Sequence, residues 1–142
     1  MARGGFYSVD SLRGVYVLLV DEDAENRTVS SAILRYCGAL VRDIASLDEA
    51  LVAMRETTPG VVVVGVRPPA NSALALIRGL RSLQPEHGGK IPAVGVGPIS
   101  EADAARLNGF DSYLEEPIDP WALCRLVSEL SSYGARGAVY YE

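Results

Sequence analysis

Residues 15–23 read VYVLLVDED, and this stretch decides the fold expected for the chain. Its first six residues are uninterrupted apolar side chains, many of them β-branched, which is typical of a strand that is covered on both faces. Asp23 is placed to cap a helix directly after that strand. A buried strand followed at once by a helix is the first unit of an alternating α/β protein.

The same alternation continues along the chain. Further strands are predicted over residues 39–44, 61–66, 91–96 and 110–114, and helices over residues 24–37, 46–57, 71–83, 100–107 and 120–133. Ser46 with Glu49, Ser100 and Asp119 are the expected caps of later helices, and Gly38 is the expected left-handed stop of the first. Right-handed crossovers make this order a doubly wound parallel sheet in three layers, in which sites lie at the carboxyl ends of the strands.

Length and composition favour one domain and exclude several function classes. The chain has 142 residues, which we divide into an extension (1–13), a domain (14–133) and a tail (134–142). Its 13 basic and 18 acidic residues give a net charge of −5, which argues against nucleic-acid binding. No apolar run approaches the roughly 20 residues of a membrane helix. Cys37 and Cys124 are expected to be free thiols in a reducing cytoplasm.

Four segments together resemble the receiver domains of response regulators in two-component signalling. They are VLLVDED (17–23), PGVVVV (59–64), IPAV (91–94) and GFDSYL with PIDP (109–114 and 117–120). The resemblance covers residues 14–131 and implies a flavodoxin-like, CheY-like sheet with strand order 2-1-3-4-5 and five helices. It also implies, in active members, phosphoryl transfer from a histidine kinase to an aspartate. Residues 12–14 and the loop 86–90 look similar to receivers attached to hybrid sensor kinases.

The positions that carry this chemistry in the family are mostly replaced here. The acidic pair maps onto Asp21 and Glu22, and its charge is kept. The resemblance places the phosphate-accepting aspartate at Gly65, the hydroxyl residue at Gly97 and the lysine at Glu116. Glycine offers no nucleophile, and the lysine has become a carboxylate. The sequence therefore predicts a degenerate site, a pseudo-receiver that is not phosphorylated.

The sequence also suggests a metal site and two further site residues, Arg67 and Tyr113. Asp21 and Glu22 lack a third carboxylate, so we expect at best a weak Mg²⁺ site and no other cofactor. Arg67 is the nearest cation to the carboxylates at the strand ends, and we expect it either to pair with them or to point to solvent. Tyr113 occupies the aromatic switch position of the fifth strand and is a candidate interface residue.

Three functions follow as alternatives. The favoured one is a cytoplasmic protein-interaction module of a two-component or phosphorelay system, with a sensor kinase or another regulator as partner. A homodimer through the face of the fourth helix, fifth strand and fifth helix is a further expectation by analogy of fold. The alternatives are a receiver that can be phosphorylated, if the alignment is shifted, and a small flavodoxin-like enzyme or cofactor carrier. Neither a membrane nor a nucleic acid is an expected partner.

Overall fold

The computed structural model describes residues 11–139, and their side chains as far as Ser131. Strands and helices alternate along these residues. The strands are β1 (Tyr16–Val20), β2 (Leu40–Ile44), β3 (Val61–Gly65), β4 (Ala93–Gly97) and β5 (Ser112–Glu115). The α-helices are α1 (Ala24–Tyr36), α2 (Leu47–Glu56), α3 (Asn71–Arg81), α4 (Ala102–Asn108) and α5 (Pro120–Val139). Two short 3-10 helices are η1 (Pro85–His87) and η2 (Ile99–Glu101).

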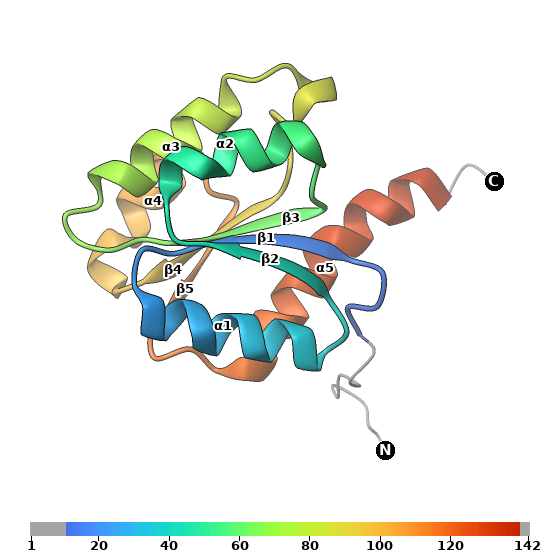
Figure 1. The fold of residues 1–142 in the computed structure, drawn as a ribbon, viewed down its shortest axis with the longest axis horizontal. Helices are drawn as coiled ribbons and strands as arrows, with labels where there is room; N and C mark the ends of the chain where they lie inside the picture. The colour runs from blue at the N-terminus through green and yellow to red at the C-terminus, as the bar shows by residue number, and fades with distance from the viewer. Residues whose placement is uncertain (1–10, 140–142) are drawn as a thin grey trace.

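The strands form one parallel sheet in the order β2-β1-β3-β4-β5. Helices α1 and α5 cover one face of this sheet, and α2, α3 and α4 cover the other (Figure 1). This confirms the predicted flavodoxin-like, doubly wound sheet in three layers. The strand order reverses beside β1, so the crevice between the carboxyl ends of β1 and β3 is where this class of fold places its sites.

The central strand β3 shows why the sheet forms. All of its residues are buried, and its valines alternate between the two faces. Val61 and Val63 join the core under α1 and α5, whereas Val62 and Val64 join the core under α2 and α3. Each residue therefore removes apolar surface from water on one side or the other, which is the main driving force for the three layers. Within residues 11–139, no helix is long and apolar enough to span a bilayer.

Most helix ends follow the local rules that the sequence suggested. The amide of Asn26 donates to Asp23 Oδ1 (2.9 Å) at the start of α1, and the amide of Trp121 donates to Asp119 Oδ1 (3.0 Å) at the start of α5. Gly38 follows α1 with a φ of +99°, the left-handed conformation expected of a stop signal. These ends are set by single side chains or by one glycine, which explains why they could be predicted.

One predicted cap differs in its hydrogen bonding, and two predicted helix ends are wrong. Ser46 Oγ accepts from the amide of Asp48, not from that of Glu49, so the predicted capping box is replaced by a simpler cap. Ser100 lies inside η2, and α4 begins at Ala102 without a side-chain cap. Helix α5 continues to Val139 instead of ending at residue 133. A glycine inside a helix costs only about 1 kcal/mol, so Gly134 does not stop it.

The segment before β1 is tied to the domain, although we predicted it to be an extension. Leu12 is fully buried with the core residues under α1 and α5, and its amide donates to the Cys37 carbonyl (2.8 Å). The folded unit therefore begins before residue 14. Residues 1–10 and 140–142, the rest of the predicted extension and tail, lie outside the described residues.

Candidate functional site

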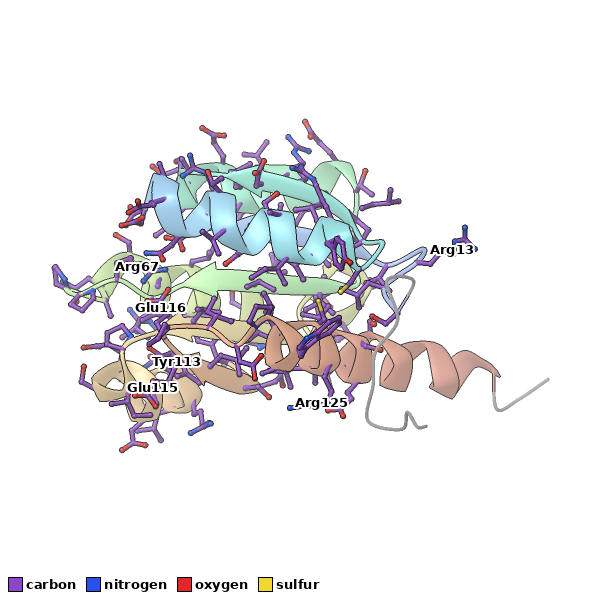
Figure 2. All side chains as sticks on the ribbon, turned by 90° about the horizontal axis from the view of Figure 1, so that it is seen from below. Arg13, Arg67, Tyr113, Glu115, Glu116 and Arg125 are labelled. Atoms are coloured by element: carbon purple, nitrogen blue, oxygen red, sulfur yellow. The ribbon has the colours of Figure 1, made fainter. Side chains whose placement is uncertain are left out.

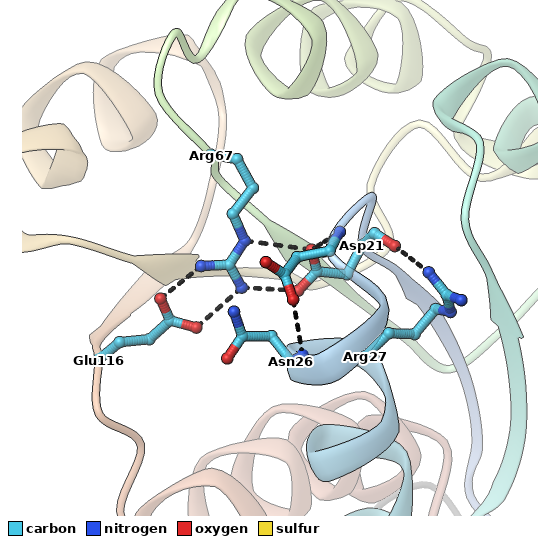
Figure 3. A network of polar contacts seen from close by, with 6 residues as sticks. Asp21, Asn26, Arg27, Arg67 and Glu116 are labelled. Carbon is cyan, nitrogen blue, oxygen red and sulfur yellow. Dashed lines mark hydrogen bonds and ion pairs between the residues drawn. The ribbon is translucent and has the colours of Figure 1, made fainter.

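One arginine joins two carboxylates at the carboxyl ends of three strands (Figure 3). Asp21 follows β1, Arg67 comes two residues after β3, and Glu116 follows β5. Arg67 Nε and Nη2 donate to Asp21 Oδ1 (3.1 Å) and Oδ2 (2.6 Å). On its other side, Arg67 Nη2 donates to Glu116 Oε2 (2.8 Å) and Nη1 donates to Oε1. We call these three residues the Arg67 bridge, a planar guanidinium held by two carboxylates in the geometry that favours arginine.

Asp21 is the most buried member of the Arg67 bridge. Its side chain is 3% exposed, and Oδ1 accepts a further hydrogen bond from the amide of Asp23 (2.9 Å). Its backbone is held as well, because Arg27 Nη1 donates to the Asp21 carbonyl (2.8 Å). A carboxylate buried to this extent is stable only when it is paired and hydrogen-bonded. Asp21 therefore depends on Arg67.

The electrostatics of Arg67 follow from the same contacts. Its side chain is 18% exposed, and burial by itself acts to lower the pKa of the guanidinium. The hydrogen bonds to Glu116 and Asp21 outweigh burial, so the pKa of Arg67 is raised above its usual value. Arg67 therefore stays positively charged between the two carboxylates.

Gly65 makes room for this arrangement. A Cβ atom at Gly65 would lie within 2.5 Å of Asp21 Oδ1, which is far inside van der Waals contact. Any side chain at this position would push Asp21 out of its present place. The position to which the resemblance assigns the phosphate acceptor is thus occupied by the Asp21 carboxylate, which Arg67 holds.

Two glycines of β4 make room for Tyr113 on β5. A Cβ at Gly95 would lie 2.9 Å from Tyr113 Cδ1, and one at Gly97 would lie 2.7 Å from Tyr113 Oη. The ring therefore packs against β4, and Oη donates to the Pro98 carbonyl (2.6 Å). Figure 2 shows Tyr113, Glu115, Glu116 and Arg67 at one end of the sheet, with Arg13 at the other. Tyr113 is 7% exposed, so almost none of its surface is available to a partner.

The surroundings of Tyr113 also change the pKa of its phenol. Burial of the ring, followed by the negative charges of Glu101 and Glu116, raises the pKa of Tyr113 to about 12. Both causes act against the phenolate, since it would lose hydration and face like charges. Tyr113 therefore stays protonated and keeps its hydrogen bond throughout the neutral range.

The structure brings together some of the predicted site residues and separates others. Asp21, Arg67 and Glu116 are in contact, so Arg67 pairs with the two carboxylates and does not point to solvent. Glu22 was expected beside them, but its side chain is exposed and lines a hollow with Ser46. Adjacent residues at a strand end point in different directions, which separates Glu22 from Asp21.

Sequence reasoning missed the role of Gly95. The signal was available, because Gly95 and Gly97 are spaced by two and therefore face the same side of β4. The register of the sheet pairs Gly95 with Tyr113 on β5. Small residues beside a large aromatic side chain on the next strand indicate a packing pair.

A divalent cation would need oxygen ligands that this site does not offer freely. Both carboxylate oxygens of Asp21 already accept hydrogen bonds from Arg67. Gly65 supplies no carboxylate, and Glu22 lies in a separate hollow. Within residues 11–139, no group of three or more His, Cys, Asp or Glu side chains is arranged to hold a metal ion.

Comparison with known proteins gives two sequence relatives. No protein-family model matches the sequence. The chain is 30% identical over 124 residues to an uncharacterised 14.6 kDa protein from Leptolyngbya boryana, covering 85% of this chain and 93% of that one. It is 31% identical over 104 residues to the C4-dicarboxylate transport transcriptional regulatory protein DctD of Rhizobium meliloti (strain 1021). That match covers 71% of this chain and only 22% of DctD.

Comparison with solved structures shows which known fold the chain shares. A protein described as a response regulator from Chloroflexus aurantiacus J-10-fl superposes with a TM-score of 0.76 and 25% identity. The superposition covers 83% of this chain and 98% of that protein. The chain belongs to one family with the Leptolyngbya boryana protein, and its structure matches those of response-regulator receiver domains.

Proposed function

We propose that the chain is a receiver-like signalling module, a pseudo-receiver that acts through protein contact without being phosphorylated. One observation carries this proposal. The Arg67 bridge fills the strand ends where the resemblance implies a phosphoryl group, and Gly65 lies beneath it without a nucleophile. The site is therefore closed by the protein's own side chains.

The chemistry of phosphoryl transfer supports the proposal. Transfer to a protein needs an oxygen nucleophile, a cation and positive groups where negative charge develops. Residues 57–84 contain no Asp or Glu, so a shifted alignment provides no acceptor on β3. Gly97 has no hydroxyl group, and Glu116 places a negative charge where the family has a lysine. A receiver that can be phosphorylated is therefore the weaker alternative.

Mg²⁺ is not a resident cofactor in this proposal. Binding at Asp21 would require the ion to displace Arg67 from a carboxylate that is 3% exposed. The site also offers no paired acid and base or phosphate-binding loop that would favour an enzyme or a cofactor carrier. Binding, and not catalysis, is the activity that the geometry supports.

The test is exposure of the purified chain to acetyl phosphate and Mg²⁺, followed by intact-mass measurement. We expect no mass gain, and no change in the amide NMR spectrum when beryllofluoride replaces acetyl phosphate. The positive control is a receiver that carries the acceptor aspartate, treated in the same way. A phosphorylated species of this chain, or beryllofluoride-dependent shifts around β3, would overturn the proposal.

The proposed contact surface is the face of α4, β5 and α5, with a sensor kinase, another regulator or a second copy of the chain as partner. On this surface Leu107 is 87% exposed and the neighbouring Ile99 is 60% exposed, so both apolar side chains are available to a partner. A self-association test is direct: sedimentation velocity over a concentration series on the chain and on Leu107→Asp. A concentration-dependent dimer that Leu107→Asp abolishes supports a second copy. An unchanged monomer leaves a different protein as the proposed partner.

A further inference from the structure

Two thiols that are 87 positions apart in the sequence meet inside the protein. Cys37 forms the end of α1, and Cys124 lies near the start of α5. Their Sγ atoms are 2.7 Å apart, and both side chains are buried. Their spacing in the sequence matches no common disulfide or metal-binding pattern, so this contact was not expected.

The contact lies beside an opening between the two helices. Both cysteines line an apolar groove of about 300 Å³ together with Ile33, Tyr36 and Trp121. Tyr36 is 66% exposed and Trp121 is 43% exposed, so the groove borders solvent. The thiols belong to the core under α1 and α5 and also line this groove, so they lie at the edge of that core.

The composition of the groove limits the chemistry that two thiols can perform here. Its lining includes the aromatic side chains of Tyr36 and Trp121 but no carboxylate and no Lys, Arg or His side chain. No third metal-ligating side chain completes a site with the two thiols within the described residues. A bond between the two thiols needs an external oxidant but no further side chain.

We propose that Cys37 and Cys124 form an intramolecular disulfide when the chain meets a low-molecular-weight disulfide, and that this bond clamps α1 to α5. In the first step, one cysteine sulfur attacks the small disulfide, forms a mixed disulfide and releases one thiol. In the second step, the other cysteine sulfur attacks the mixed disulfide and releases the second thiol. Two electrons and two protons thus pass from the protein to the small disulfide.

Burial decides how the reaction must be tested. Burial, together with the contact to Cys37, raises the pKa of the Cys124 thiol, and the thiolate is the reactive form. Thiol–disulfide exchange in the native protein is therefore slow near neutral pH. This slow rate does not affect how much of the protein disulfide is present at equilibrium. Refolding in a redox buffer removes this barrier, because both thiols are accessible in the unfolded chain.

The experiment refolds the full chain from denaturant in a buffer of reduced and oxidised glutathione, followed by acid quenching and alkylation. We expect a monomer that is lighter by about 2 Da, resists alkylation and yields one cross-linked peptide containing both cysteines. Its Tm should exceed that of the reduced chain by more than about 5 °C, because the bond closes a long loop. Cys37→Ser and Cys124→Ala, each verified as folded by circular dichroism, should show neither the mass loss nor the Tm rise.

Each contrary result overturns a stated part of the proposal. Two free thiols, two glutathione adducts or a disulfide between chains would show that the pair does not form the bond. An intramolecular disulfide that lowers the Tm would show that the bond strains α1 against α5 and does not clamp them. The outcome is independent of the phosphorylation test, because the thiols lie outside the Arg67 bridge.

Discussion

At the scale of single residues, Arg67 determines the character of the candidate site. Its guanidinium provides the positive charge that two neighbouring carboxylates require, and Gly65 provides the space in which Asp21 reaches it. A buried ion pair contributes little relative to an apolar replacement, but removal of one partner is costly. The three residues therefore depend on one another.

The first prediction concerns the substitution Arg67→Gln. Glutamine keeps hydrogen-bonding capacity but removes the charge, so Asp21 stays buried without a counter-ion. We expect the free energy of unfolding to fall by about 2–4 kcal/mol, measured by urea denaturation at neutral pH.

Arg42→Gln is the matched control for this measurement. Arg42 pairs with Glu56 at 2.7 Å, but the two side chains are 45% and 58% exposed. Water screens such a pair, so its loss should lower the free energy of unfolding much less than Arg67→Gln does. Equal losses in the two variants would mean that the burial of Asp21 has no energetic role.

The second prediction concerns Tyr113 and alkaline pH. The folded state holds the phenol proton up to a pKa of about 12, whereas an unperturbed tyrosine releases it near 10.0. Between these values the unfolded chain has lost a proton that the folded chain still binds. The stability that Tyr113 contributes is therefore fully present below pH 10, and it is lost as the pH rises from 10 to about 12.

Urea denaturation at a series of alkaline pH values measures this slope. Tyr113→Phe should reduce it, because the other tyrosines titrate in both proteins but this one is absent. At neutral pH the same variant should lose about 1 kcal/mol, for the hydrogen bond to the Pro98 carbonyl. An unchanged alkaline slope in Tyr113→Phe would contradict a raised pKa at this residue.

At the scale of elements, the third prediction compares two serines that look alike in sequence. Ser46 caps α2 through the amide of Asp48, whereas Ser100 lies within η2 and caps nothing. Ser46→Ala should lower stability by about 1 kcal/mol, and Ser100→Ala should lie within about 0.5 kcal/mol of the wild type. Thermal unfolding of the two variants side by side measures the difference. A reversed order would show that the capping geometry is wrong.

At the scale of the whole molecule, Arg67 places a positive charge at the carboxyl ends of the strands of an acidic chain. The net charge is −5, and the carboxyl ends of the strands would be strongly negative without Arg67. The weak Mg²⁺ site expected from the sequence at Asp21 and Glu22 shares Asp21 with the Arg67 bridge, so arginine and a metal ion would compete for this carboxylate. This competition gives the fourth prediction.

The fourth prediction is that Arg67→Ala gains a response to Mg²⁺ that the wild type lacks. With the guanidinium removed, Asp21 and Glu116 offer free oxygen ligands, which a hard divalent cation prefers. Millimolar Mg²⁺ should raise the Tm of Arg67→Ala and leave that of the wild type unchanged. A similar Mg²⁺-dependent rise in both proteins would show that Arg67 does not occupy the cation's place.

The sequence by itself determined the fold and the absence of a carboxylate at position 65. Alternating apolar runs and helical segments depend on neighbours in the chain, so the sheet, its layers and most caps could be predicted from local rules. The glycine at position 65 is likewise visible without coordinates. Local rules failed at Ser100, which lies inside η2, and at Gly134, through which α5 continues, because a single serine or glycine does not by itself fix a helix end.

Only the tertiary structure decided which side chains meet. Arg67 contacts residues 46 and 49 positions away, and the two cysteines are 87 positions apart. Such contacts depend on strand order, register and side-chain direction together, and a shift of one residue in a strand reverses its faces. Packing in three dimensions therefore decided three features. Arg67 pairs with carboxylates and not with solvent, Glu22 lies apart from Asp21, and the two thiols meet.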